Sequence, residues 1–94
     1  MFEWDGRKAA ANHAKHGVSF EETVTVFADP NALDGPGPRH SEKEPRLLRL
    51  GRAVTGRVLI VAYILRRRGD GESIRIISAR RASSKERAAY AAAS

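Results

Sequence analysis

Eight consecutive apolar residues, 58–65 (VLIVAYIL), lie between two arginines, Arg57 and Arg66. A run of this length is too short to cross a bilayer as a helix, which takes about 20 residues. A continuous apolar strand is typical of the centre of a sheet, where at least one face is covered. The segment 57–66 therefore predicts the central strand of the fold, and the rest of the chain has to supply its neighbours and its cover.

Two neighbouring strands are predicted around this central one. Residues 46–54 (RLLRLGRAV) precede it, across a Thr-Gly pair at 55–56 that suits a tight hairpin turn. Residues 73–80 (SIRIISAR) follow it, across the polar turn 67–72 (RRGDGE). Short turns connect antiparallel neighbours, so these segments predict an antiparallel meander. A short edge strand at 31–33 would add a fourth strand to the three.

Strand alternation predicts that every second side chain shares a face of the sheet. Arg66 and Arg80 each lie at the C-terminal end of a strand, and antiparallel neighbours run in opposite directions. The two arginines are therefore expected toward opposite ends of the sheet, unless a bulge or a tilt brings them together. The alternation also assigns one shared face to Ile74, Ile76, Ser78 and Arg80, and one to Val58, Ile60, Ala62, Ile64 and Arg66.

Two helices are predicted ahead of the strands. Asp5 is a good N-cap for residues 6–16 (GRKAAANHAKH), and Gly17 suits the left-handed position that follows a helix end. Ser19 and Glu22 then form a capping box, which begins a second helix. One face of this second helix is apolar and consists of Phe20, Val24, Phe27 and Ala28. The pair Asp29-Pro30 ends the helix.

A third helix is predicted at the C-terminal end. Ser83 and Glu86 form another capping box, and an alanine-rich segment follows them (KERAAYAAA). The Gly- and Pro-rich stretch 34–38 (DGPGP) predicts a mobile loop, which continues through His40. The order of two helices, three or four antiparallel strands and a last helix predicts a single α+β domain over residues 1–94.

The composition excludes several kinds of site. The chain has no cysteine, so it forms no disulfide and no thiolate metal site, as is usual in the cytoplasm. The N-terminal segment lacks an apolar signal core, so secretion is not expected. His13 and His16 lie three residues apart, a spacing that could bind a metal ion, but no carboxylate is obviously placed to complete the site. We therefore predict neither a metal ion nor a cofactor, and no membrane.

The charge is unevenly divided along the chain, whose formal net charge is +6. Residues 1–45 carry five Lys and Arg against eight acids, and residues 46–94 carry twelve against three. Arginine predominates in the second half, and its planar fork matches the oxygens of phosphate and carboxylate groups. This asymmetry predicts a nucleic acid or an acidic protein as partner. Alternatively, the arginines are solvated strand edges that discourage aggregation.

Four segments, in order along almost the whole chain, closely resemble the BrnT family of ribonuclease toxins of type II toxin–antitoxin systems. They are FEWD…KHGVSFEET…VFADP (2–30), HSEKEPR (40–46), GRVLIVAYILR (56–66) and RIISARRASSKERAAY (75–90). The resemblance implies a compact RelE-like α+β fold, RNA cleavage and growth arrest. It also implies neutralisation by a BrnA-like antitoxin, which dimerises and binds operator DNA, in a hetero-oligomeric complex. The chain departs from the family pattern at Pro45, at Ile64 and in the loop 34–38.

The resemblance further implies cleavage without a metal ion, by attack of the RNA's own 2′-OH on the neighbouring phosphorus. Arg66 and Arg80 are then expected to hold the phosphate, and Tyr90 or Glu86 to assist proton transfer or to orient an arginine. Further acid–base candidates are His40 and Glu44, and further RNA-binding candidates are Lys15, Arg46, Arg57, Arg75 and Arg81. The alternative is a non-catalytic basic module that binds nucleic acid or an acidic protein.

Overall fold

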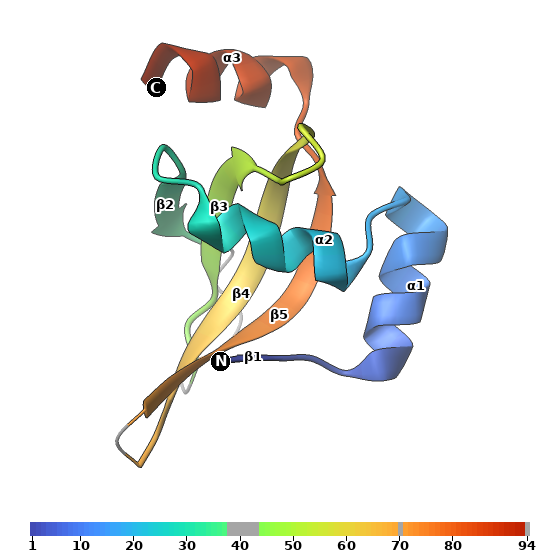
Figure 1. The fold of residues 1–94 in the computed structure, drawn as a ribbon, viewed down its shortest axis with the longest axis vertical. Coiled ribbons are helices and arrows are strands. Elements are labelled where there is room, and N and C mark those ends of the chain that lie inside the picture. Colours follow the sequence, from blue (N-terminus) through green and yellow to red (C-terminus); the bar gives the residue numbers. More distant parts are fainter. Residues whose placement is uncertain (38–43, 70, 94) are drawn as a thin grey trace.

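A computed structural model describes residues 1–37, 44–69 and 71–93 of the chain (Figure 1). The predicted α+β class is confirmed, with helices α1 and α2 before most of the strands and α3 after them. The second predicted helix is different, since only five residues are α-helical and a 3₁₀ turn, η1, continues them. In chain order the elements are β1 (Phe2–Glu3), α1 (Gly6–His16), α2 (Phe20–Val24), η1 (Thr25–Ala28), β2 (Leu33–Pro36), β3 (Leu47–Arg52), β4 (Val58–Arg68), β5 (Gly71–Arg81) and α3 (Ser84–Ala93).

The strands form one sheet in the order β1-β5-β4-β3-β2. Strands β2 to β5 pair antiparallel, and the two residues of β1 pair parallel with β5. The predicted three- or four-stranded antiparallel sheet is therefore wrong in strand number and in direction, because the sheet has five strands and is mixed. The predicted central place of β4 is correct, since it lies between β3 and β5.

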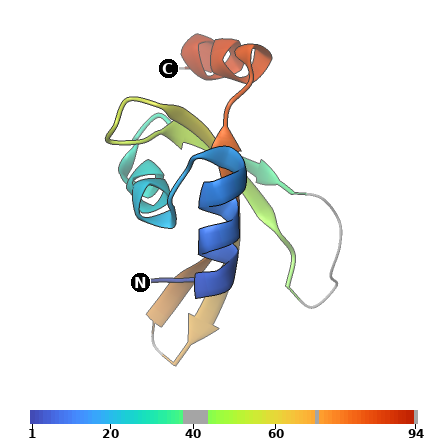
Figure 2. The ribbon, with the colours of Figure 1, turned by 90° about the vertical axis from the view of Figure 1, so that its right-hand side faces the viewer.

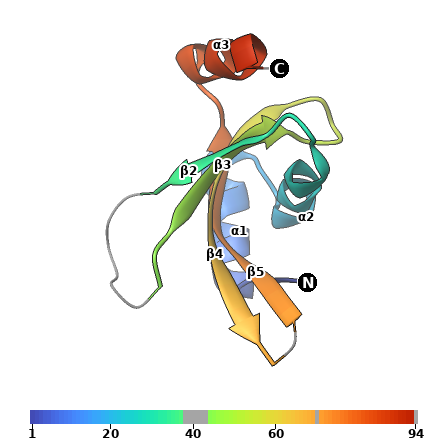
Figure 3. The ribbon, with the colours of Figure 1, turned by 90° about the vertical axis from the view of Figure 1, so that its left-hand side faces the viewer.

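The main core lies between the sheet and the α2–η1 segment, which Figure 3 shows on one side of the sheet. Leu59, Val61 and Tyr63 of β4 point into it and are almost completely buried. Phe20 and Val26, from α2 and η1, meet them there and are fully buried. We call this side the helix face of the sheet and the opposite side its outer face. At one end of the molecule, α3 stands apart from α1 and α2 (Figure 2).

A β-bulge interrupts the pairing of β4 with β5. Ala62 pairs with Ser78 while Tyr63 pairs with Ile76, so Ile77 is the extra residue. An extra residue reverses the alternation of side chains beyond it. Ile76 and Ala79 consequently both lie in the main core. The predicted shared face of Ile74, Ile76, Ser78 and Arg80 is therefore wrong, because Ser78 and Arg80 lie on the outer face.

Helix α1 is fastened to the edge of β5 by the side chain of Asn12. Its amide nitrogen donates to the carbonyl oxygens of Val18 and Ala79, at 3.0 and 2.9 Å. Its amide oxygen accepts from the backbone N–H of Ala79, at 3.1 Å. This pair of bonds to Ala79 has the pattern of a neighbouring strand, at a place beyond the reach of β1. The last turn of α1 therefore lies beside the C-terminal half of β5.

The segment predicted as a loop at 34–38 begins with an edge strand. Strand β2 runs from Leu33 to Pro36 and pairs with β3, so the short edge strand expected at 31–33 lies two to three residues further on. Proline is tolerated here because an edge strand need not donate on its outer side. Asp34 anchors the strand through Arg49, at 2.9 Å, and through the hydroxyl of Tyr63, at 2.7 Å.

Tyr63 is held by burial and by the Asp34 carboxylate, which together raise the pKa of its phenol to about 12. It therefore stays protonated at neutral pH, and its bond to Asp34 links β4 to β2 across β3.

No helix within the described residues is both long and apolar enough to span a membrane.

Candidate functional site

A hollow of about 350 Å³ opens on the outer face of the sheet. We call it the outer hollow. Its charged rim comes from Arg46, just before β3, from Arg80 near the end of β5, and from His16 at the end of α1. Its remaining lining residues are Leu48, Ile60, Ala62, Ser78 and Ala79. The bulge at Ile77 matters here, because it is what turns Ser78 and Arg80 toward this face.

Glu86 holds Arg80 in a fixed orientation. Two parallel bonds, at 2.8 and 2.9 Å, join the Arg80 guanidinium to the two Glu86 carboxylate oxygens. The predicted capping box places Glu86, since its carboxylate accepts from the Ser83 amide at 2.8 Å and its amide donates to the Ser83 hydroxyl at 3.1 Å. The cap of α3 thereby presents a guanidinium at the rim of the outer hollow.

The Glu86 carboxyl is ionised at neutral pH. The Arg80 guanidinium and then the Ser83 amide lower its pKa from 4.5 to about 2. A group in this state has no proton to donate and little tendency to accept one. Of the two predicted roles for Glu86, the geometry favours orienting an arginine over transferring a proton.

We expect Glu86→Gln to reveal this pKa in the stability of the protein. A lowered folded-state pKa stabilises above the unfolded pKa, and the stabilisation is lost as pH falls from about 4.5 toward about 2. The gap in urea midpoint between the protein and Glu86→Gln should therefore be present at pH 7 and shrink across that range. Both side chains are partly exposed, so the gap is expected to be small.

Glu72→Gln is the matched control for this measurement, because the Glu72–Arg67 pair is 3.5 Å apart and mostly exposed. Its gap in urea midpoint should be near zero at every pH. If the gap in urea midpoint between Glu86→Gln and the parent protein stays constant from pH 7 to pH 2, the lowered pKa of Glu86 is contradicted.

Arg66 lies far from Arg80, as strand direction predicted. In the pairing of β4 with β5, Arg66 faces Ser73 whereas Arg80 faces Ile60. Six residues of β4 separate the two places, which is roughly 20 Å at the rise of a strand. The backbone positions of the two arginines therefore do not support binding of one shared phosphate.

Arg66 instead belongs to a cluster of internal ion pairs. Glu44 binds it through two bonds, at 2.8 and 3.0 Å, and Glu3 binds it at 3.1 Å. Glu3 also accepts from Arg75 at 3.2 Å and from the Ser73 hydroxyl at 3.2 Å. These contacts join β1, β4 and β5 at the end of the sheet away from α3. Three predicted site residues therefore belong to this cluster and lie away from Arg80: Arg66, Arg75 and Glu44.

A second hollow, of about 420 Å³, lies between α3 and the turn that joins β3 to β4. We call it the α3 hollow. Four arginines line it: Arg52, Arg57, Arg81 and Arg87. Glu22 binds Arg57 through a two-pronged ion pair, and the Gly17 carbonyl accepts from Arg57 at 2.9 Å. Arg57 and Arg81 were predicted to bind RNA; Arg52 and Arg87 were not, because only the packing of α3 brings them to the same place.

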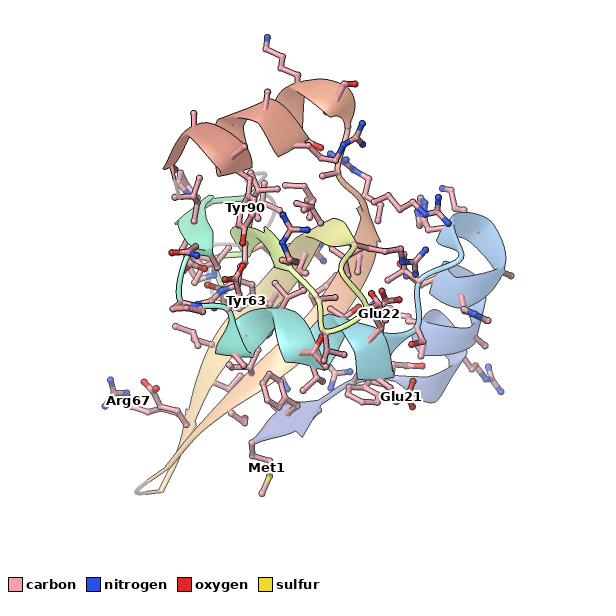
Figure 4. The ribbon with its side chains drawn as sticks, turned by 45° about the horizontal axis from the view of Figure 1, so that its top comes forward. Met1, Glu21, Glu22, Tyr63, Arg67 and Tyr90 are labelled. Atoms are coloured by element: carbon pink, nitrogen blue, oxygen red, sulfur yellow. The ribbon has the colours of Figure 1, made fainter. Side chains whose placement is uncertain are left out.

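Tyr90 packs beneath α3 and lines the α3 hollow (Figure 4). Its ring is almost fully buried, and its hydroxyl donates to an Asp29 carboxylate oxygen at 2.6 Å. That bond, followed by burial, raises the pKa of the Tyr90 phenol. The guanidinium of Arg52 lies over the ring, 5.5 Å from its centre. These contacts give Tyr90 a part in holding α3 to the body of the protein and leave its hydroxyl bound to Asp29.

Two predicted site residues remain, Lys15 and His40. Lys15 is exposed in the last turn of α1, next to His16. His40 lies outside the described residues. Within the described ranges, no three His, Asp or Glu side chains are grouped so that they could hold a metal ion. The sequence suggested His16 only as a possible metal ligand together with His13. That His16 and Arg80 line the same hollow depends on the bond from Asn12 to β5, which the sequence does not reveal.

An apolar groove of about 600 Å³ runs along α2 and η1 on the helix side. Val24, Phe27 and Ala53 line it, and Val54 at its rim is 81% exposed. Arg52 lines both this groove and the α3 hollow, so the two are neighbours.

A family model described as "Ribonuclease toxin, BrnT, of type II toxin-antitoxin system" matches residues 4–86. The matched region takes in Arg46, Arg80 and Glu86 and ends before Tyr90. No curated protein matches the chain.

Proposed function

The chain belongs to the BrnT family of ribonuclease toxins of type II toxin–antitoxin systems, and from this we propose that it cleaves RNA at the outer hollow, without a metal ion. The observation that carries the proposal is the arginine fork of Arg80, held by Glu86 at a hollow that Arg46 also lines. We further propose that residues 1–94 act as one toxin domain.

The proposed reaction is attack of a ribose 2′-oxygen on the adjacent phosphorus. A bond from the 2′-oxygen to phosphorus forms, the bond from phosphorus to the 5′-oxygen breaks, and the products are a 2′,3′-cyclic phosphate and a 5′-hydroxyl. Negative charge grows on the two non-bridging oxygens during the attack. Arg80 and Arg46 would stabilise that charge, because preoriented guanidinium donors in a partly enclosed site act strongly on developing charge.

The RNA strand is proposed to continue from the outer hollow into the α3 hollow. Arg80 and Arg81 are consecutive in β5 and point to opposite faces, so together they span the end of the sheet. The four arginines of the α3 hollow would then bind phosphates next to the cleaved one. Lys15 would extend the same surface beside His16.

The family implies an antitoxin partner, and we propose a BrnA-like one. The apolar groove and the α3 hollow adjoin at Arg52. A segment with apolar side chains followed by acidic ones would match both surfaces at once and would cover the arginines proposed to bind RNA. Binding of this kind would neutralise the toxin by competing with its substrate.

The test is to produce the chain alone in bacteria and then together with the product of its neighbouring gene. We expect growth arrest in the first case and recovery in the second. The purified chain should cleave RNA in the presence of EDTA and leave 2′,3′-cyclic phosphate ends. A requirement for added metal ion would contradict the proposed chemistry.

The alternative function is RNA binding without cleavage, and the four arginines of the α3 hollow favour it as the second candidate. It predicts RNA binding that weakens steeply with salt, together with no cleavage product at any concentration of the chain.

A further inference from the structure

The proposed cleavage needs a group that removes the proton of the 2′-hydroxyl, and three of the groups predicted to transfer protons are engaged elsewhere. Glu86 is ionised but both of its oxygens hold Arg80. Glu44 binds Arg66 with both oxygens, at the other end of the sheet. The hydroxyl of Tyr90 is bound to Asp29. None of these three residues lines the outer hollow.

His16 lies where such a group is required. It is the last residue of α1, it is half-buried, and it lines the outer hollow together with Arg46 and Arg80. Its place follows from the fold, because residues four apart share a helix face and Asn12 is four residues before it. Asn12 binds the backbone of Ala79, the residue that precedes Arg80. The same contact that fastens α1 to β5 thus places the His16 imidazole at the hollow that Arg80 also lines.

Gly17 ends the helix directly after His16. Its φ of 69° is left-handed, which glycine adopts without strain, and its amide donates to the His13 carbonyl at 2.9 Å. The chain therefore turns away immediately after His16 and leaves the imidazole at the end of the helix rather than between two turns.

We propose that His16 is the general base of the cleavage, an inference that rests on the proposed ribonuclease function. A neutral imidazole nitrogen takes the proton from the 2′-hydroxyl as the new bond to phosphorus forms. The departing 5′-oxygen takes a proton from water, and His16 afterwards returns its own proton to solvent. Imidazole suits this task because it exchanges a proton near neutral pH, which the arginines around it do not.

The charged groups near His16 come from several elements. Arg46 and Arg80 line the hollow with it, and Glu86 binds Arg80 from α3. Lys15 precedes it on α1, and Arg57 of the β3–β4 connection binds the Gly17 carbonyl. The test therefore compares the pH profile of cleavage with and without the imidazole of His16.

The test measures cleavage of a short RNA by the purified full chain in EDTA, from pH 5 to pH 9. We expect kcat/KM to rise with pH and then level off. His16→Ala should lower kcat by about 10²-fold near neutral pH, leave KM within a few-fold, and remove the rising limb. Imidazole added to the buffer should restore part of the rate to His16→Ala.

His13→Ala is the matched control, since His13 is an exposed histidine on the same helix and outside the lining of the hollow. It should behave as the parent protein. His16→Asn keeps a polar side chain and serves as a second variant, with urea midpoints measured for all. A folded His16→Ala or His16→Asn that retains the parent rate and rising limb would overturn the inference, as would a loss confined to KM.

The outcome also separates this inference from the proposed function. If Arg80→Ala is inactive while both His16 variants are active, the ribonuclease function stands and the role of His16 does not. If the parent chain cleaves no RNA in EDTA, both fail together. A rate that falls with rising pH would overturn the assignment of His16 as the base.

Discussion

Replacing Arg80 by alanine is expected to lower the rate of RNA cleavage by about 10²–10³-fold, the usual cost of one preoriented donor to developing negative charge. The effect should be on kcat rather than on RNA affinity, because the other arginines near the hollow still attract the phosphate backbone. Arg80→Lys should recover only a small part of the rate, since lysine supplies charge but lacks the fork that Glu86 orients through two parallel bonds. Steady-state kinetics on a short RNA gives both constants.

The matched control for Arg80 is Arg67, whose side chain is 82% exposed at the far end of β4. Figure 4 shows Arg67 projecting away from the body of the protein, on the side remote from Tyr90. Arg67→Ala should leave the rate unchanged. Equal rates for Arg80→Ala and Arg67→Ala would rule out the outer hollow as the place of cleavage.

Asn12→Ala is expected to cost the largest amount of stability, on the order of 3 to 5 kcal/mol. The substitution leaves two backbone carbonyls and one backbone N–H without their bonds, at a residue that is only 7% exposed. Each buried group left unpaired costs about 1–3 kcal/mol. A domain of this size has a total stability of about 5–15 kcal/mol, so the variant should be close to unfolding. Urea unfolding measures the loss.

Two companion variants make the Asn12 result specific. His13→Ala removes the exposed neighbouring side chain on the same helix and should change the free energy of unfolding by less than about 0.5 kcal/mol. Asn12→Asp keeps an oxygen for the Ala79 amide but loses both donated bonds, so it should also be strongly destabilised. A loss below about 1 kcal/mol in Asn12→Ala would mean that water replaces the amide and that α1 is held by other contacts.

The parts of the fold that the sequence predicts well are those with local causes. The cap at Asp5, the glycine at 17 and the capping box at Ser83 lie within a few residues of the helix ends that they determine. The apolar run of β4 is equally local. The pairing of the two-residue strand β1 with β5 was not predicted, because it joins residues more than seventy positions apart. The bulge at Ile77 is invisible for the same reason, since it exists only relative to Tyr63 across the sheet.

In the candidate site too, the contacts between residues close in sequence were predicted and those that depend on helix packing were not. Arg80 and Glu86 are six residues apart, and orienting an arginine was one of the two roles predicted for Glu86. The separation of Arg66 from Arg80 followed from strand direction alone. His16 beside Arg80, and Arg52 beside Arg87, depend on how α1 and α3 pack, and no short-range pattern encodes that packing.

The Asn12 amide has a consequence for self-association. A strand from another molecule can be added only where backbone groups of an edge are vacant, and such additions underlie fibres and domain swaps. On the β5 edge, β1 pairs with Ile74 and Arg75, and Asn12 binds the backbone of Ala79. Growth of the sheet through an incoming strand is thereby directed to the β2 side, where Pro36 offers no amide hydrogen. An incoming strand at the β5 edge would therefore meet backbone groups that β1 and Asn12 already bind.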